Sequence, residues 1–431
     1  MNTIKNLITN KVHLIIYWFL CLYFQQFVTQ LLLPSTIRFT LWHILWVIDI
    51  AWVMIILIYD IYKKNICVKT SKIFILTIFV LFTTISWILK QPNHGPYYIF
   101  TLVTLYEQVF IFYTYAKDKN VKDIKFLLNK LATLFVYLTS LYTSVSLVSY
   151  FTNYTSFSLP NGSTINMLIL REATLSHNPI RLQGLWTNTS IASFDCYLAI
   201  LLSLYLIENG KNKYFHYILI FLNSIMIYFA NSRLALIILF FIFTCLSLFK
   251  FKKNHFSKKS LINSFCLFIV VIILFILYRF YSNPNLLCSL INNPYETFKN
   301  LSTLRLQMAE GILSTLKNYY LLGSGYCNNE YLLVNFNEPH PHNIFLALLL
   351  YTGIPGLVLF TMFLILNVKD IVHNLDYIKL NNLNWLVILV ICVFFESLLD
   401  IAIIGAPINI QTLYFYLCLG ILVKDFTNEK L

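Results

Sequence analysis

Residues 337–343 read Asn-Glu-Pro-His-Pro-His-Asn and stand directly before a long apolar run. His342 and His340 each neighbour a proline, and Glu338 lies just before them. An unperturbed imidazole titrates near pH ~6.5, so it can take up a proton at neutral pH. Such a group can serve as general base for an attacking hydroxyl. We expect His342, on the first turn of the apolar span, to be this base. His340 and Glu338 are expected to support it, because the flanking prolines hold them in extended backbone.

Three arginines, Arg181, Arg233 and Arg305, offer a second kind of chemistry. A guanidinium stays charged and can grip phosphate through two hydrogen bonds, which an ammonium cannot do. We therefore expect them to bind an anion. A cap on neighbouring carbonyls is the alternative for Arg233, which stands in a very short connection. Near Arg181, the ring of Trp186 could stack on a sugar or mark the membrane interface.

The elements that must hold these residues are membrane spans. Of the 431 residues, 58% are hydrophobic and only 11% are charged, whereas a soluble domain has about a quarter charged. Apolar runs of about 20 residues, enough to cross a bilayer, recur along the chain. The pattern predicts an all-α polytopic membrane protein with about twelve transmembrane helices. The predicted spans start near His13, Leu41, Ile73, Tyr97, Phe126, Ser190, Phe215, Leu234, Leu261, Asn343, Trp385 and Ile408.

The basic residues set the predicted orientation. Every second loop is rich in lysine, as cytoplasmic loops are, so both termini are expected inside. The net charge of +13 is then mostly a topology signal. Nucleic-acid binding is not expected, because the lysines alternate with spans and form no single patch. The arginines behave differently, and all six fall on the outer side: Arg38, Arg171, Arg181, Arg233, Arg279 and Arg305.

Two long outer loops divide the chain. The expected parts are N-terminal spans in 1–150, a first outer loop in 151–189, central spans in 190–281, a second outer loop in 282–342 and C-terminal spans in 343–431. In the second loop, an apolar residue recurs at helical spacing from Leu301 to Leu316, which predicts an amphipathic helix with Arg305 at the edge of its apolar stripe. Gly323-Ser324-Gly325 then ends it. That turn could cradle phosphate through its backbone N–H groups, or be a plain turn.

Acidic residues within the predicted spans are Asp49, Glu107, Asp195, Glu396 and Asp400. Charged groups at such depth usually face a bundle interior or a wet cavity. We expect structural pairing for all five. A proton relay, as in a transporter, is the alternative.

The motifs taken in order resemble a known family. They are R-x-x-G-L-W-x-N from Arg181, N-S-R-L-A around Arg233, T-L-R-L-Q-M-A-E-G-I-L around Arg305, L-L-G-S-G-Y from Leu321 and H-N-I-F-L-x-x-L-L-Y-T-G-I-P-G from His342. This set resembles the bacterial O-antigen ligase and Wzy-type surface-polysaccharide polymerase superfamily. The resemblance covers roughly residues 181–356, whereas the first five spans match only in general character.

The resemblance implies a glycosyltransferase at the outer face of the bacterial inner membrane. Its donor would be an undecaprenyl-diphosphate-linked glycan, its diphosphate held by Arg181, Arg233 and Arg305, with His342 activating the acceptor hydroxyl. No cofactor or metal is expected, and a single displacement would invert the anomeric carbon. A polymerase is favoured over a ligase that transfers to lipopolysaccharide core. A lipid-linked oligosaccharide flippase or another transporter is the rival class. Expected partners are membrane lipid, a chain-length regulator and a flippase.

Overall fold

The computed structural model describes part of the chain. The described stretches are 14–20, 71–90, 121–152, 156–158, 164–166, 170–171, 181–182, 184–186, 189–230, 232–251, 291–295, 305–326, 330–337, 341–398 and 410–424, with single positions at 23, 47, 51, 55, 58, 109, 112, 113 and 328.

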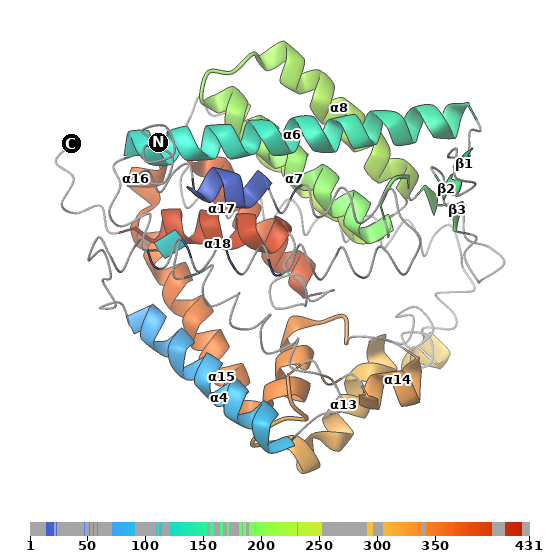
Figure 1. Ribbon diagram of the computed structural model, residues 1–431, viewed down its shortest axis with the longest axis vertical. Helices are drawn as coiled ribbons and strands as arrows, with labels where there is room; N and C mark the ends of the chain where they lie inside the picture. The colour runs from blue at the N-terminus through green and yellow to red at the C-terminus, as the bar shows by residue number, and fades with distance from the viewer. Residues whose placement is uncertain are drawn as a thin grey trace.

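Most of the described residues are helical. The helices of the first half are α4 (Ser71–Lys90), α6 (Val121–Phe151), α7 (Thr189–Glu208), α8 (Lys213–Ala230) and α9 (Arg233–Phe251). Those of the second half are α13 (Arg305–Tyr319), α14 (Glu330–Phe336), α15 (Ile344–His373), α16 (Leu375–Leu380), α17 (Asn384–Ser397) and α18 (Ile410–Leu422). Figure 1 shows their arrangement.

Five of these helices are long and apolar enough to cross a membrane: α4, α6, α7, α8 and α15. Shorter apolar helices lie within α9, α17 and α18. A helix satisfies its own backbone hydrogen bonds, which is why apolar stretches take this form in a bilayer. The predicted spans that start near Ile73, Phe126, Ser190, Phe215, Leu234, Asn343, Trp385 and Ile408 each coincide with a helix. Those predicted from His13, Leu41, Tyr97 and Leu261 lie largely outside the described residues.

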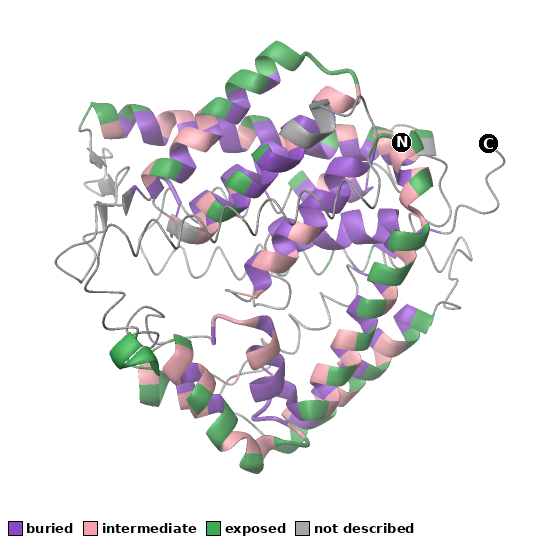
Figure 2. Cartoon of the chain, turned by 180° about the vertical axis from the view of Figure 1, so that it is seen from behind, coloured by how far each residue is buried: buried purple, intermediate pink, exposed green. Residues whose placement is uncertain are grey.

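The helix α7 forms the centre of the bundle. It packs against α6, α8, α9, α17 and α18, and 83% of its most apolar stretch is buried, against 33% for α4. Figure 2 shows this buried interior, with exposed positions along the outer helices. Large apolar side chains such as Phe74 of α4 and Phe221 of α8 are exposed, as expected of helices that face lipid.

The helix α15 carries a break in its outer part. Gly353 adopts φ 66° and ψ −170°, outside the helical region, and Pro355 follows within the same helix. Proline lacks the N–H that would continue the ladder, so the two together interrupt it. The same helix lies along α4 and also contacts α13.

The first long loop adds short strands to the helical fold. It holds two antiparallel strand pairs, β1 (Ser156–Ser158) with β2 (Thr164–Asn166), and β3 (Leu170–Arg171) with β4 (Arg181–Leu182). In the second pair Arg171 stands opposite Arg181. Pairing to a neighbouring strand satisfies the backbone of a loop that is too irregular for a helix.

Candidate functional site

The start of α15 is fixed by the side chain of Asn343. Its Oδ1 accepts hydrogen bonds from the N–H groups of Phe345 and Leu346, at 2.9 and 3.0 Å. Asparagine is among the best residues for this N-cap role. The Nδ2 of Asn343 donates to the carbonyl of Leu398, just beyond α17, at 2.7 Å. One side chain therefore caps α15 and attaches it to α17.

His342 lies two residues before the first residue of the helix and directly before its cap. The expectation that it sits on the first turn of the span is wrong, because Asn343 is the cap and the helix begins at Ile344. The backbone of His342 is left-handed, with φ 50°, and the residue is half-buried. A non-glycine residue rarely takes this conformation, and such residues cluster at functional sites. The predicted supporting residues His340 and Glu338 lie outside the described residues.

Arg305 is the first residue of α13 and is exposed. A helix stands where the amphipathic one was predicted, and over its described part Met308 and Ile312 are buried while Ser314 and Lys317 are exposed. The middle of α13 packs on α14, where a Cβ on Gly311 would lie 2.6 Å from the hydroxyl of Tyr331.

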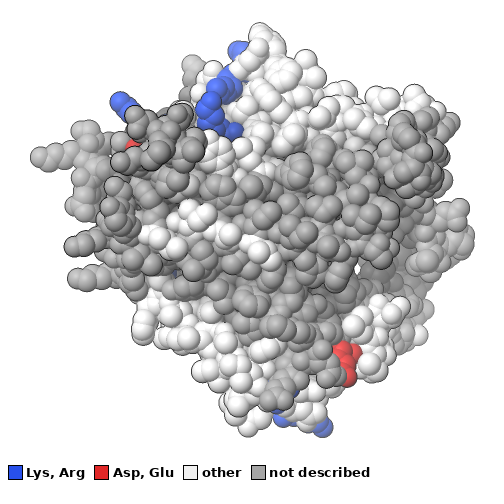
Figure 3. Space-filling view, viewed as in Figure 1, with Lys and Arg blue, Asp and Glu red and all other residues white. Residues whose placement is uncertain are grey.

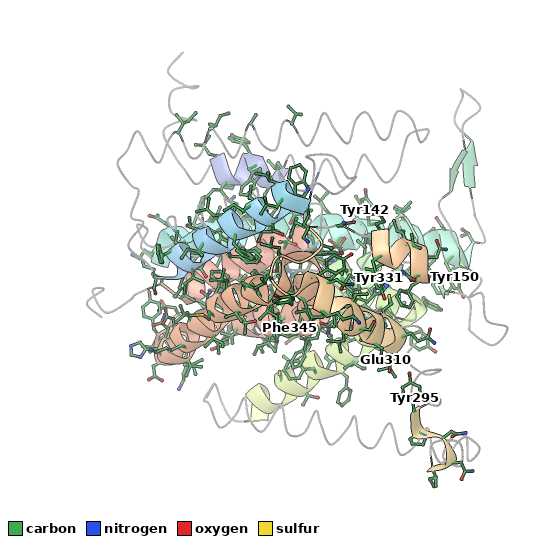
Figure 4. The ribbon with its side chains drawn as sticks, turned by 90° about the horizontal axis from the view of Figure 1, so that it is seen from below. Tyr142, Tyr150, Tyr295, Glu310, Tyr331 and Phe345 are labelled. Atoms are coloured by element: carbon green, nitrogen blue, oxygen red, sulfur yellow. The ribbon has the colours of Figure 1, made fainter. Side chains whose placement is uncertain are left out.

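The helices α13, α14 and α15 can be located in Figure 4 by the labelled side chains. Tyr331 marks α14 beside α13, and Phe345 marks the first turn of α15. Close to the start of α13, Tyr295 donates a 2.7 Å hydrogen bond to the carboxylate of Glu310. Arg305 and His342 are thus carried by neighbouring elements, because α13 packs directly on α15.

The Gly-Ser-Gly turn after α13 does not have its first two N–H groups available for phosphate. The N–H of Gly323 donates to the carbonyl of Tyr319 at 2.8 Å, and the N–H of Ser324 donates to the carbonyl of Leu350 at 2.7 Å. The interpretation as a phosphate cradle is therefore wrong at these positions, and the turn packs on α15 instead.

The motifs of Arg181 and Arg233 meet at one end of α8. The strand β4, which begins with Arg181, packs on α8. A Cβ on Gly184 would lie 3.3 Å from the terminal methyl of Met226, near the C-terminal end of that helix at Ala230. Arg233 follows as the first residue of α9, with the hydroxyl of Ser232 accepting from the N–H of Ala235 at 3.5 Å. The backbone thus brings these two arginine positions to the same end of α8.

The side chain of Trp186 lies in the interior of the protein. It is buried, with 4% of its surface exposed, and its Nε1 donates a 2.9 Å hydrogen bond to Oδ2 of Asp195. Its ring meets the edge of Tyr142 at 5.4 Å between centroids. The interpretation of Trp186 as an exposed sugar platform or interface anchor is therefore wrong.

The other oxygen of Asp195 accepts from Nε2 of Gln411, in the first turn of α18, at 3.2 Å. Two residues along α7 from Asp195, the hydroxyl of Tyr197 donates to Glu396 of α17. The expected structural pairing is confirmed for both acids, since each binds a side chain of another segment. Asp49, Glu107 and Asp400 lie outside the described residues.

These contacts connect the two groups of predicted residues through the bundle. Trp186, in the loop with Arg181, is hydrogen-bonded to Asp195 of α7. Tyr197 of α7 is hydrogen-bonded to Glu396 of α17. The carbonyl of Leu398, just beyond α17, is hydrogen-bonded to Asn343, the residue that follows His342. The sequence gives Trp186, Glu396 and Asn343 as polar or aromatic residues near the outer ends of spans, but only the fold shows that they form one connection.

An apolar cavity of about 640 Å³ opens between α9, α15, α17 and α18. It runs from Phe345, on the first turn of α15, to Ile371 near the other end of that helix, and Phe394 and Phe415 line its wall. Among the residues that line it, only Thr361 and Asn367 are polar. In Figure 3 the charged side chains of the described surface lie in a few separate places, with white surface between them near the top and in the lower part of the view. The cavity beside the start of α15 could therefore hold a hydrocarbon chain.

The long apolar helices and their buried polar contacts are those of a polytopic helical membrane protein. Residues 218–361 match the family model of O-antigen ligase. This match confirms the resemblance to the O-antigen ligase and Wzy-type polymerase superfamily over about a third of the chain. The match includes Arg233, Arg305 and His342, whereas Arg181 lies before it. No curated protein matches the chain.

Proposed function

We propose that the protein is a polysaccharide polymerase. It would transfer a growing glycan from undecaprenyl diphosphate to a sugar hydroxyl of another lipid-linked repeat unit. The observation that carries the proposal is the place of His342, at the lip of a span whose first turn lines an apolar cavity, within a match to O-antigen ligase. A base beside a hydrocarbon cavity suits a substrate that joins a sugar to a lipid.

In this proposal the imidazole of His342 accepts the proton of the acceptor hydroxyl, whose oxygen bonds to the anomeric carbon of the donor sugar. The bond from that carbon to the diphosphate breaks, and its electron pair leaves with the lipid diphosphate. Arg181, Arg233 and Arg305 hold the diphosphate and stabilise the charge that develops on it. One displacement inverts the anomeric carbon. The energy comes from the sugar–diphosphate bond, so the proposal requires neither a metal ion nor a cofactor.

The cavity supports the choice of a lipid donor. Its walls are apolar along most of α15, so a polyisoprenoid chain can move from the bilayer into the cavity without exposing hydrocarbon to water. We place the protein in the bacterial inner membrane, with its site at the outer face and both termini in the cytoplasm. A flippase that delivers repeat units and a chain-length regulator are the proposed partners.

A ligase is the second candidate, because the matched family model is described as O-antigen ligase. A ligase would use the same donor and transfer the glycan to lipopolysaccharide core. The two differ in the acceptor. A cell that lacks this protein and accumulates full-length lipid-linked chains without core attachment would identify a ligase. A cell that accumulates single repeat units would identify a polymerase.

The experiment is deletion of the gene followed by gel profiling of surface polysaccharide, with complementation by wild type, His342→Asn and Arg305→Lys. The proposal expects unpolymerised repeat units at the outer face in the deletion strain and in both variants. Repeat units trapped on the inner face would reject the proposal in favour of a flippase. Full-length surface chains in the His342→Asn strain would reject the role of the imidazole.

A further inference from the structure

The break in α15 exchanges hydrogen bonds with the segment that follows α13. In a regular helix the N–H of Ile354 would donate to the carbonyl of Leu350. Here the N–H of Ile354 donates to the carbonyl of Tyr320 at 2.8 Å. The carbonyl of Leu350 accepts instead from Ser324, from its N–H at 2.7 Å and from its hydroxyl at 3.0 Å. The N–H of Ile354 and the carbonyl of Leu350, which would bond to each other in a regular helix, therefore both find partners in the segment after α13.

Two glycines allow the two backbones to approach this closely. Gly323 and Gly353 both have φ of 66°, which favours glycine. A Cβ on Gly323 would lie 2.5 Å from the carbonyl oxygen of Tyr351, and a Cβ on Gly353 would lie 2.7 Å from that of Tyr320. Either side chain would collide with backbone that cannot rotate away. The approach therefore depends on glycine at both positions.

A third helix closes the far side of the segment. The hydroxyl of Ser86 on α4 donates to the carbonyl of Leu322, and the ammonium of Lys90 lies 5.6 Å from the ring of Tyr319. Residues 323–326 are buried. Ile354 lies ten residues into α15, roughly 15 Å along the helix. Irregular backbone at such depth is tolerated only where it is buried in protein, as this segment is between α4 and α15.

We propose that residues 319–326 are a splice that fixes α13 to α15, so that Arg305 is held at a set position relative to His342, and that Ser324 is a positioning residue in it. The proposal rests on the roles given to Arg305 and His342 above. The splice connects the two helices directly, because it begins at Tyr319, the last residue of α13, and forms hydrogen bonds with α15, the helix that His342 precedes.

The first test does not depend on activity. Trypsin applied to the purified full-length protein can cut α13 after Lys317, which is exposed, once the helix opens locally. Gly323→Ala and Gly353→Ala should each raise the cleavage rate at least about tenfold, because a left-handed residue with a Cβ is strained. Ser324→Ala keeps its N–H bond and loses only the hydroxyl bond, so a rise of about two- to fivefold is expected. Ser314→Ala is the control, since its hydroxyl is exposed and bonds only within α13.

The second test measures glycan transfer per folded protein. Each splice variant should lower kcat/KM, and the loss should be much smaller when Arg305 is already alanine, because the splice acts through Arg305. A merely structural role would give equal losses in both backgrounds. Unchanged cleavage in both glycine variants would overturn the splice, and raised cleavage with unchanged or additive kcat/KM would overturn the positioning role. If wild type lacks transfer activity, the proposed function fails, and the cleavage rates still decide whether the splice holds α13.

Discussion

The indole of Trp186 donates a hydrogen bond of 2.9 Å to the carboxylate of Asp195. The tryptophan belongs to the first long loop, which also carries Arg181, whereas the aspartate lies on the second turn of α7, at the centre of the bundle. Since both side chains are buried, this bond attaches the end of that loop to α7.

Trp186→Phe should lower the stability of the purified protein by about 1–3 kcal/mol, the usual cost of leaving a buried polar group without its partner. The phenyl ring preserves most of the packing on Tyr142, so the loss reports mainly the hydrogen bond. Thermal unfolding in detergent measures it, and a cycle with Asp195→Asn isolates the coupling between the two residues. Trp87→Phe is the control, because Nε1 of Trp87 meets no hydrogen-bond partner in the described part of the chain. Equal losses in the two tryptophan variants would contradict the prediction.

Asn343→Ser should be milder than Asn343→Ala. A serine hydroxyl can still cap α15 but cannot reach Leu398, whereas alanine loses both functions. We expect about 1 kcal/mol for the serine variant and about 2 kcal/mol for the alanine variant. Asn335→Ala, which removes an exposed bond within α14, should leave the melting temperature nearly unchanged. If serine and alanine are equivalent, the cap does not contribute.

His342→Asn should lower kcat by roughly 10²–10⁴-fold while the protein remains folded. Asparagine tolerates the left-handed backbone that His342 adopts, so the substitution removes the imidazole without adding strain. A base must be unprotonated, so wild-type kcat/KM should fall as the pH drops through the range around ~6.5 in which an imidazole takes up a proton. The pH profile of the variant should lack this acidic limb. A variant profile with the limb intact would place the base elsewhere.

Arg305→Lys should reduce transfer at least about tenfold, because an ammonium cannot bind phosphate through two parallel hydrogen bonds. The reverse exchange on the same helix, Lys317→Arg, is the matched control and should leave transfer unchanged, since that residue is exposed near the other end of α13. Kinetics with a lipid-diphosphate-linked glycan provide the measurement. Full activity of Arg305→Lys would remove the argument for bidentate phosphate binding.

The sequence predicted a helix for each span that falls among the described residues, because length and hydropathy decide where a helix can lie in a bilayer. It also predicted the amphipathic face of α13, where Met308 and Ile312 recur one turn apart. Those patterns are local, so tertiary contacts had little to change. The start of α15 was predicted to within a residue, and the known preference for asparagine at a helix N-cap would have placed His342 outside it.

The interior connections could not be predicted in the same way. The residue type of Trp186 fits a sugar platform as well as a buried donor, and only its position against Asp195 decides between them. From the sequence, Gly323 indicates only the end of a helix. Its partner is the break at Gly353, thirty residues later in the chain, and no local pattern connects the two. Contacts of this kind depend on two distant segments at once, and one sequence carries no record of their pairing.

The break at Gly353 makes α15 two rods with a joint between them. The inner rod is fastened to its surroundings, where Asp370 pairs with Lys72 of α4 and Asn367 accepts from Tyr113. The outer rod is short, extends from Ile344 to the joint, and has the segment after α13 bonded at its base. The outer rod is held at its tip as well, by the hydrogen bond from Asn343 to Leu398, so His342 can shift relative to the inner half of the helix only if one of these attachments opens.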